Sequence, residues 1–386
     1  MVSSPGNSGI TALLRGMRDG RAPLPRRPAG RLLWLHLPAG LPGDALDELT
    51  HALEDIHILC TGAGVALQDV LCQPAPGPRK THIDQFLAHW QPDILLWGRA
   101  ENGLAVVRRA KRAGVKMLMA DLAGQGLAAG MRGRQLTEFL QYFEKILLTD
   151  DAEQERLAKH GLGEAQLTLC QPLSEIAAAL PENEALQRRY AGALGARPVW
   201  CAAMVSRGEV GTLLAAHRQA VRSFPNLLLV VVPRAAPEVM ARQIREDGWR
   251  LAQASPETLP DRQAEVLLAQ NADDLPTWMR LASVSYMGGT LFGPEAADPF
   301  GAVALGSAVL SGPMQAPFEH RYQRLIHAGA LALAETNAVL AAKLVEALAP
   351  ELSAKLALAA WHVGSEGARA VQILAGEIMA QFEEGS

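Results

Sequence analysis

A glycine-rich stretch in the last third of the chain, GGTLFGPEAADPFGAVALG at 288–306, has the pattern of a strand end, a tight turn and a short helix. Asp298 can cap that helix, Pro299 suits its first turn and Gly306 suits its exit. Backbone N–H groups at such a helix start favour an anion, often a phosphate. The stretch contains no His and no Lys, and its one Glu, Glu295, precedes the helix. It therefore predicts the backbone of a phosphate site with few side-chain ligands.

Two further segments offer contacts to the same kind of ligand. Arg234 follows an apolar run at 226–232, where a guanidinium could pair bidentately with a phosphate or form a surface ion pair. Gly208 and Glu209 precede a helical pattern, and the N–H groups of this loop, like those at 288–290, are expected to be bare. The favourable position of an acid in a first helical turn explains Glu209 equally well. The residues predicted to contact a phosphate-bearing ligand are Arg234, Gly208, Glu209, Gly288, Gly289, Thr290 and Asp298.

The elements that would carry these residues are an alternating series of strands and helices. Near-continuous apolar runs, typical of strands covered on both faces, lie at 31–37, 55–62, 93–98, 115–122 and 145–150, and again at 199–205, 226–232, 265–271, 283–290, 308–313 and 330–335. Helical patterns lie between them, and a polar joint at 180–198 separates the two series. The pattern predicts an α/β fold of two Rossmann-like domains facing a central cleft, because ligands of such sheets bind beyond the carboxyl ends of the strands.

Length, charge and composition argue against several classes of protein. A length of 386 residues exceeds one ordinary core, and a net charge of −4 with a pI near 6.2 gives no indication of nucleic acid as a partner. The four cysteines have no metal-ligand spacing, and Cys60, Cys170 and Cys201 are expected to be buried thiols in a reducing compartment. No apolar run approaches the roughly 20 residues needed to span a bilayer. The arginine-rich segment at 13–31 is either a contact to an anionic membrane surface or a solvated leader.

Several pieces of the sequence carry a resemblance to a known family. They are RLLWLHLPAGLPGD (31–44), HWQPDILLWGRAEN (89–102), EKILLTDDAEQERLAKHG (144–161), RPVWCAAMVSRGEV (197–210), FPNLLLVVVPR (224–234), ASVSYMGGTL (282–291) and PFGAVALGSAVLSGP (299–313). In this order they resemble the Kdo transferases of lipopolysaccharide synthesis, with gaps, from about residue 30 to 345. That family transfers 3-deoxy-D-manno-octulosonic acid (Kdo) from CMP-Kdo to a lipid A precursor, on a GT-B fold and without a metal.

The resemblance implies an inverting, metal-independent glycosyltransferase with no cofactor. Its partners would be CMP-Kdo and a lipid A precursor, or another lipid or sugar acceptor, at the cytoplasmic face of the inner membrane, where the protein would be peripheral. The predicted order is a basic leader at 1–30, an acceptor domain at 31–180, a linker at 181–198, a nucleotide-sugar domain at 199–367 and a C-terminal helix at 368–386.

The sequence departs from the family pattern at most side-chain ligands of the donor. The family has His-Asn and a ribose-binding Glu where this chain has Ala297, Asp298 and Gly301. Its Ser-Thr-His becomes Met204, Val205 and Ser206, its His after Pro-Arg becomes Ala235, and its linker Lys is absent from CQPLSEI at 170–176. Because a carboxylate on a ribose hydroxyl contributes about 1.5–3 kcal/mol per bond, Gly301 predicts weaker CMP binding.

In the first half, three residues are candidates for the acceptor side. Asp44 matches the family's catalytic Glu after a shift of two residues; it is either the general base or a cap for the helix that follows, accepting from the N–H groups of residues 46–47. His36 ends a strand and is either an orienting group or a buried histidine. Glu101, after the run at 93–98, is either an acceptor contact or a loop residue.

Three hypotheses follow from this pattern. The first is a Kdo-transferase-like enzyme with a reduced set of ligands. The second is a non-catalytic relative that binds or scaffolds, and the third is a transferase with a changed donor, in which Ala297, Ala235 and Met204 line a less polar pocket. Fold alone does not distinguish them, because function depends on the site.

Overall fold

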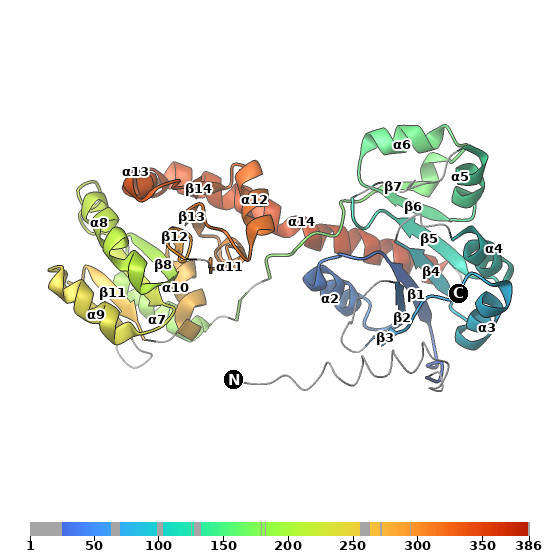
Figure 1. Cartoon of the computed structure of the whole chain (residues 1–386), viewed down its shortest axis with the longest axis horizontal. Helices are drawn as coiled ribbons and strands as arrows, with labels where there is room; N and C mark the ends of the chain where they lie inside the picture. Colours follow the sequence, from blue (N-terminus) through green and yellow to red (C-terminus); the bar gives the residue numbers. More distant parts are fainter. Residues whose placement is uncertain are drawn as a thin grey trace. The chain divides into compact units, whose positions relative to one another are not determined.

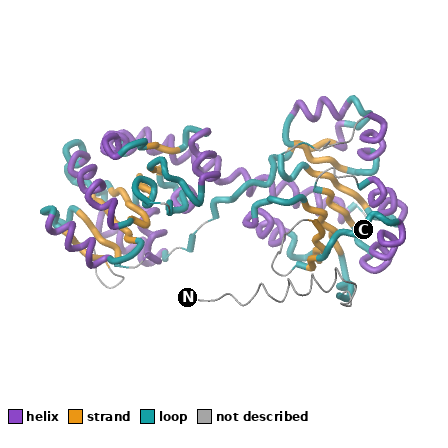
Figure 2. The backbone as a smooth tube through the Cα atoms, in the orientation of Figure 1, coloured by secondary structure: helices purple, strands orange, loops and turns teal. Residues whose placement is uncertain are grey.

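The chain divides into two compact units, each built around its own parallel sheet (Figure 1). The computed structural model describes residues 25–62, 70–98, 103–124, 126, 133–178, 180–181, 183–254, 263–270, 272–293 and 295–384. Unit 1 is formed by the described residues up to Ile176 and from Glu366 onward, and unit 2 by those from Ala177 to Ser365. The α/β class with two Rossmann-like domains is confirmed. Figure 2 shows the strands of each unit side by side with helices around them.

Unit 1 contains a seven-stranded sheet in the order β3-β2-β1-β4-β5-β6-β7, and the strands pair in parallel. The strands are β1 (Leu32–Leu37), β2 (His57–Gly62), β3 (Leu71–Cys72), β4 (Ile94–Trp97), β5 (Lys116–Ala120), β6 (Lys145–Leu148) and β7 (Leu167–Leu169). The helices are α2 (Gly43–Ala52), α3 (Lys80–Trp90), α4 (Leu104–Arg112), α5 (Gly133–Leu140), α6 (Asp151–Ala158) and the short η1 (Glu164–Gln166), together with the end of α14 (Pro350–Glu383).

Both faces of this sheet are buried, which is why most positions of its strands are apolar. In β1, Leu32 and Trp34 face a cluster that includes α3, α4, α5 and α6, whereas Leu33 and Leu35 face a cluster that includes α2 and the end of α14. Successive strand residues point to opposite faces, so a continuous apolar run is needed to fill both clusters.

Unit 2 contains a second seven-stranded sheet in the order β10-β11-β9-β8-β12-β13-β14, again parallel. The strands are β8 (Val199–Val205), β9 (Leu228–Pro233), β10 (Leu251–Ala254), β11 (Val266–Ala269), β12 (Val284–Met287), β13 (Ala308–Ser311) and β14 (Leu331–Leu333). The helices are α7 (Glu184–Leu194), η2 (Arg207–Glu209), α8 (Val210–Ala220), α9 (Pro237–Glu246), η3 (Ala272–Asp274), α10 (Leu275–Leu281), α11 (Phe300–Ala304), α12 (Glu319–His327), α13 (Asn337–Ala347) and the first part of α14.

The unit boundaries differ from those predicted from the sequence. The first boundary falls between Ile176 and Ala177, so the predicted linker at 181–198 lies in unit 2, where it forms α7 and packs on α10. The predicted C-terminal helix is the end of the longer α14, which passes from unit 2 to unit 1 after Ser365. A polar, helical segment between two strand series looks like a linker in sequence, but buried Leu186 and Tyr190 anchor it in the unit 2 core.

The predicted basic leader is described only from residue 25, and the end of it packs on unit 1. Arg27 Nε donates to the Trp90 carbonyl at 2.8 Å, and Arg27 Nη2 lies 3.6 Å from Asp93. Arginines 15, 18 and 21 of this segment lie outside the described residues. Within the described part of the chain, no helix combines the length and the apolar character required to cross a bilayer.

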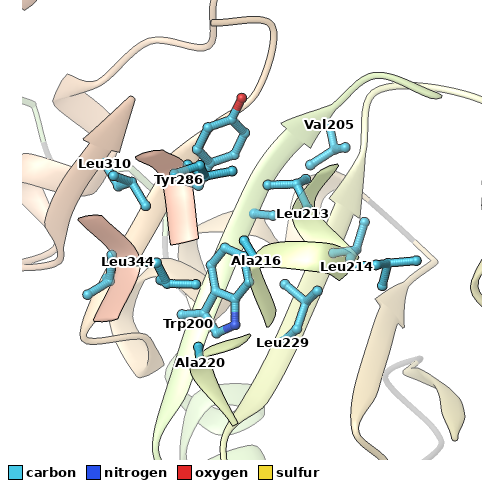
Figure 3. Packing of buried hydrophobic residues seen from close by; sticks show 14 of the residues in the cluster. Trp200, Val205, Leu213, Leu214, Ala216, Ala220, Leu229, Tyr286, Leu310 and Leu344 are labelled. Atoms are coloured by element: carbon cyan, nitrogen blue, oxygen red, sulfur yellow. The ribbon is translucent and has the colours of Figure 1, made fainter. Parts of the chain in front are cut away.

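One of the two core clusters of unit 2 contains the buried indole of Trp200 (Figure 3). Trp200 on β8 and Leu229 on β9 lie in one cluster with Leu213 and Ala216 of α8 and with Leu344 of α13. These side chains come from segments far apart in the sequence, and burying them together fixes α8 against the sheet.

A histidine is buried beside this indole. Trp200 Nε1 donates to His217 Nδ1 at 3.1 Å, and His217 Nε2 lies 3.1 Å from the carbonyl oxygen of Glu265, to which it donates. The ring also lies 4.8 Å from that of Trp249. Burial disfavours the charged ring and lowers the pKa of His217 to about 4.

This histidine predicts an acid-sensitive stability. The pKa of His217 is lower in the folded than in the unfolded chain, so the unfolded chain binds a proton more readily. Stability therefore falls as the pH drops from the ordinary histidine pKa toward the lower pKa of the folded chain. We expect the wild type to lose roughly 2 kcal/mol of unfolding free energy through this group between pH 7 and pH 5. Urea unfolding of the wild type and of His217→Gln at both values measures it, because the variant removes the titration. Equal pH dependence of the two proteins would contradict the assignment.

Candidate functional site

The strand order of each sheet identifies where a ligand is expected. In unit 1 the order reverses between β1 and β4, and in unit 2 between β8 and β12. Doubly wound sheets bind ligands outside the carboxyl ends of the strands at such a switch point. The candidate positions are therefore the loops after β1 and β4 in unit 1 and those after β8 and β12 in unit 2.

The two loops of unit 2 are joined by one buried carboxylate, that of Glu209. Glu209 Oε2 accepts from the N–H and the hydroxyl of Ser206, each at 2.9 Å. Glu209 Oε1 accepts from the Tyr286 hydroxyl at 2.7 Å, and the Gly289 N–H lies 2.8 and 2.9 Å from the two carboxylate oxygens. We call Ser206, Glu209, Tyr286 and Gly289 the Glu209 cluster. It connects the β8–α8 loop to the end of β12.

The expectation of bare N–H groups at the glycine pair was wrong. The Gly289 N–H donates to Glu209, and the Gly288 N–H donates to the carbonyl of Ala203 at 2.8 Å. Glu209 itself is 0% exposed and has internal donors on both oxygens. Glu209 therefore positions two segments of the backbone. The sequence pattern indicated only that it lies at the start of a helix. Gly208, beside it, is exposed.

The tyrosine of the cluster keeps its proton. Burial first, and then the neighbouring Glu209 carboxylate, raise the pKa of the Tyr286 hydroxyl well above its usual range. The hydroxyl therefore remains a donor to Glu209 at any physiological pH. Sequence reasoning did not identify Tyr286, because its apolar strand context gives no indication that its hydroxyl meets a carboxylate 77 positions away.

Sterics explain why two glycines follow β12. A Cβ on Gly288 would lie 2.4 Å from the Met204 carbonyl oxygen, and one on Gly289 would lie 2.0 Å from that of Glu295. Gly289 also has φ +78°, a conformation that other residues rarely adopt. The backbone of β8, that of β12 and the following loop thus approach too closely for any side chain.

Thr290 holds the next loop. Its side chain is buried, its hydroxyl donates to the Met287 carbonyl at 2.6 Å and accepts from the Gly312 N–H at 2.8 Å. The loop after β13 is therefore fixed to the end of β12. Like Glu209, this residue was predicted to contact a ligand, but its side chain is buried and its hydroxyl is used within the protein.

Strain accompanies the close approach at the end of β8. Met204 has φ +53°, and the pairing of β8 with β9 shifts register between Ala202 and Val205. Non-glycine residues with a positive φ cost energy and are concentrated at functional sites. Bulges in a strand pairing redirect the side chains that follow them. Met204 is half-buried and stands where the resemblance has the first residue of Ser-Thr-His.

Arg234 lies beside the same loops. Its Nη2 donates to the Glu295 carbonyl at 2.7 Å, and its Nη1 lies 3.4 Å from Glu295 Oε2. The surface ion pair that the sequence left open is thus present, with the Glu295 carboxylate largely exposed. A guanidinium has five N–H donors, so pairing with Glu295 leaves donor capacity for a phosphate. The phosphate contact stays a prediction.

The short helix after the glycine turn forms as predicted. Asp298 Oδ1 accepts from the Phe300 N–H at 3.0 Å, Asp298 Oδ2 accepts from Arg321, and Gly306 has φ +76° after α11. Gly301, where the resemblance has a ribose-binding Glu, is buried: a Cβ there would lie 2.9 Å from Leu180 Cδ1. This position therefore faces the unit 2 interior.

In unit 1, Asp44 lies in the first turn of α2. Its Oδ1 accepts from the Ala45 N–H and its Oδ2 from the Ile176 N–H, each at 2.9 Å. The predicted cap contact to residues 46–47 is not what the structure has, because the Leu46 N–H donates to the Pro42 carbonyl. Asp44 instead links the start of α2 to Ile176, the last residue of unit 1 before the chain enters unit 2, and is half-buried. Whether it takes a proton stays a prediction.

His36 lies at the carboxyl end of β1, in the wall of a small cavity. His36 Nδ1 and Trp34 Nε1 both contact the Thr61 hydroxyl, at 2.9 and 2.8 Å, and the His36 ring lies 4.1 Å from that of Trp97. The cavity has a volume of about 210 Å³. The residues lining it are Trp34, His36, Ala75, Pro76, Pro78, Trp97, Gly103 and Val106. The predicted acceptor contact Glu101 lies outside the described residues.

No metal site accompanies these residues where the structure is described: no three His, Cys, Asp or Glu side chains there are placed to hold an ion.

The Glu209 cluster predicts a large loss of stability when its carboxylate is removed. Glu209→Ala leaves buried N–H and hydroxyl donors without an acceptor, each at a cost of about 1–3 kcal/mol, so we expect a loss of at least about 3 kcal/mol. Glu209→Gln retains one carbonyl acceptor and is expected to lose less. Urea unfolding measures both. Glu238→Gln, on an exposed acid in the first turn of α9, is the matched control and should change stability by less than about 1 kcal/mol. A small effect of Glu209→Ala would contradict the clustering of donors.

The close backbone approach at Gly289 predicts that alanine is tolerated less well there than at Gly208. Gly289→Ala places a methyl group on backbone atoms at a positive φ, and we expect it to cost more than about 2 kcal/mol. Gly208→Ala meets nothing within 4 Å and should leave the unfolding free energy nearly unchanged. Thermal or urea unfolding of both variants decides the point; similar stabilities would show that the loops do not approach as described.

Comparison with known proteins gives sequence relatives. No protein-family model matches the chain. It is 27% identical over 183 residues to the 3-deoxy-D-manno-octulosonic acid transferase of Haemophilus influenzae, a match that covers 46% of this chain and 43% of that protein. It is 24% identical over 343 residues to a protein of Arabidopsis thaliana named probable 3-deoxy-D-manno-octulosonic acid transferase, mitochondrial, covering 82% of this chain and 76% of that one.

Among solved structures, the chain is similar to the C-terminal CMP-Kdo binding domain of WaaA from Acinetobacter baumannii, with a TM-score of 0.42 and 23% identity. That similarity covers 47% of this chain and 98% of the domain.

Proposed function

We propose that this chain, a sequence relative of curated Kdo transferases, is a glycosyltransferase that transfers Kdo from CMP-Kdo to a lipid A precursor. The observation that carries the proposal is the similarity to a curated relative over 82% of the chain, which must include residues of both units because neither unit alone makes up that share. The presence of two doubly wound sheets, each with its own switch point, supports it.

On the donor side, unit 2 would hold the nucleotide at the ends of β8 and β12. Arg234 would pair with the phosphate and stabilise the charge that develops as CMP departs. The exposed Gly208 would allow the phosphate to approach the start of α8. Glu209, Gly288, Gly289 and Thr290 would act indirectly, because their polar groups are already used to hold the loops in place. Asp298 would act in the same way by holding α11 and Arg321.

On the acceptor side, unit 1 would supply the base. In an inverting transfer the acceptor hydroxyl attacks the anomeric carbon, the bond to the CMP phosphate breaks, and a carboxylate takes the hydroxyl proton. Asp44 is half-buried at the start of α2, where it accepts from the Ala45 and Ile176 N–H groups, and it would take the proton of the acceptor hydroxyl from this position. His36, held by Thr61, would orient the acceptor. We place the reaction at the cytoplasmic face of the inner membrane because the acceptor is a lipid.

A second candidate, a relative without this activity or with a different donor, is favoured by one observation. Gly301 faces Leu180 in the interior of unit 2. The position carries no carboxylate to hold a ribose, and a larger side chain there would meet Leu180. Ala297 nearby is only 6% exposed. The nucleotide would then be held without the contacts that the resemblance implies.

A transfer assay tests the proposal. Purified chain is mixed with CMP-Kdo and a tetra-acylated lipid A precursor, and the mass of the acceptor is followed. We expect addition of Kdo by the wild type, and a fall of at least about 100-fold for Asp44→Asn, the size typical of a lost general base. The matched control is Asp47→Asn, which changes an exposed carboxylate on the same helix and should keep the activity.

The outcomes separate the candidates. Transfer that is lost in Asp44→Asn and kept in Asp47→Asn supports the enzyme and the base. Transfer that survives in Asp44→Asn contradicts the base. Failure of the wild type to transfer Kdo, beside an active Kdo transferase as positive control, contradicts the enzyme and favours the second candidate.

A further inference from the structure

Two of the four cysteines lie opposite each other on neighbouring strands of unit 1. Cys60 on β2 is the register partner of Cys72 on β3, the edge strand of the sheet. Neighbouring strands lie about 4.7–4.9 Å apart. Disulfide-bonded cysteines have Cα atoms about 4.4–6.8 Å apart, so the pairing brings these two within range.

Their side chains also share one face of the sheet. Cys60 belongs to the cluster beneath α2, and Cys72 is a partly buried member packed against the same cluster. The two thiols hydrogen-bond to each other, and this contact together with burial raises the pKa of the Cys60 thiol. The pair is therefore in contact in the reduced chain, with both residues present as thiols.

We propose that Cys60 and Cys72 form a reversible intramolecular disulfide by exchange with a low-molecular-weight disulfide such as glutathione disulfide. The Cys72 thiolate attacks one sulfur of glutathione disulfide, forms a mixed disulfide and releases one glutathione thiolate. Cys60 then gives up its proton as its sulfur attacks the Cys72 sulfur, and the second glutathione leaves. Two protein thiols are oxidised, one glutathione disulfide is reduced to two thiols, and the two protons pass to the released thiolates.

Burial decides the order of these steps. Cys72 is half-buried on a two-residue edge strand, whereas Cys60 is 3% exposed, so an incoming disulfide reaches Cys72 first and Cys60 acts as the resolving thiol. The other two cysteines differ. Cys201 is fully buried in unit 2, and the half-buried Cys170 directs its thiol to the carbonyls of Gln171 and Ala370.

The bond would affect the wall of the unit 1 cavity. The Gln73 N–H donates to the Cys60 carbonyl at 3.0 Å, and the chain continues from there to Ala75, Pro76 and Pro78, which line the cavity beside His36. Thr61, the residue after Cys60, holds the His36 ring. A disulfide would thus fasten the edge strand from which this wall begins.

The test uses the full chain with Cys170→Ser, which removes the other half-buried thiol. After treatment with glutathione disulfide, intact mass and peptide mapping should show a loss of two hydrogen atoms and a link between residues 60 and 72, reversed by excess glutathione. With Cys60→Ser added, a stable glutathione adduct on Cys72 is expected, because no resolving thiol remains. Circular dichroism establishes that both variants are folded.

Hydrogen exchange gives a second readout. We expect the Gln73 amide to exchange more slowly in the oxidised chain, since the edge strand can no longer separate from β2. Two results overturn the proposal: an adduct that persists on Cys72 although Cys60 is present, or a Cys72 thiol that stays free under oxidising glutathione.

Discussion

A buried carboxylate that is surrounded by donors constrains the whole carboxyl edge of unit 2. Glu209 accepts hydrogen bonds from Ser206, Tyr286 and Gly289, which lie at the ends of the neighbouring strands β8 and β12. A carboxylate that is 0% exposed has no contact with bulk solvent, so these donors compensate its buried charge. The glycine turn, the strained end of β8 and the position of Thr290 all depend on the loops meeting where Glu209 joins them.

In unit 2, the residues that hold the loops together are distinct from those that are exposed beside the loops, and the sequence pattern alone does not distinguish them. The residues of the Glu209 cluster use their polar groups on one another, and Thr290 uses its hydroxyl on Met287 and Gly312. Arg234, paired with Glu295, is partly exposed, and Gly208 is exposed. A site built in this way keeps its backbone shape when contacting side chains change. Ala297 and Gly301, where the resemblance has His and Glu, are both buried, and α11 forms with the Phe300 N–H held by Asp298.

Much of the fold could be predicted because the strands are long and apolar on both faces. The runs at 31–37 and 199–205 became β1 and β8 almost without change of bounds. The short edge strands β3, β7 and β10 were missed, because two to four residues carry too little pattern and pair on one side only. Residue types at the site were also visible, but their partners were not: contacts such as Glu209 to Tyr286 and Asp44 to Ile176 are decided by packing between distant segments.

Hydrogen exchange with and without CMP is the most direct test of the proposed nucleotide site at the ends of β8 and β12. We expect CMP to slow exchange in the loops at 206–209, 288–293 and 295–297 and to leave the opposite edge of the unit 2 sheet unchanged. Protection confined to other segments, or no protection at CMP concentrations that saturate an active Kdo transferase, would contradict it.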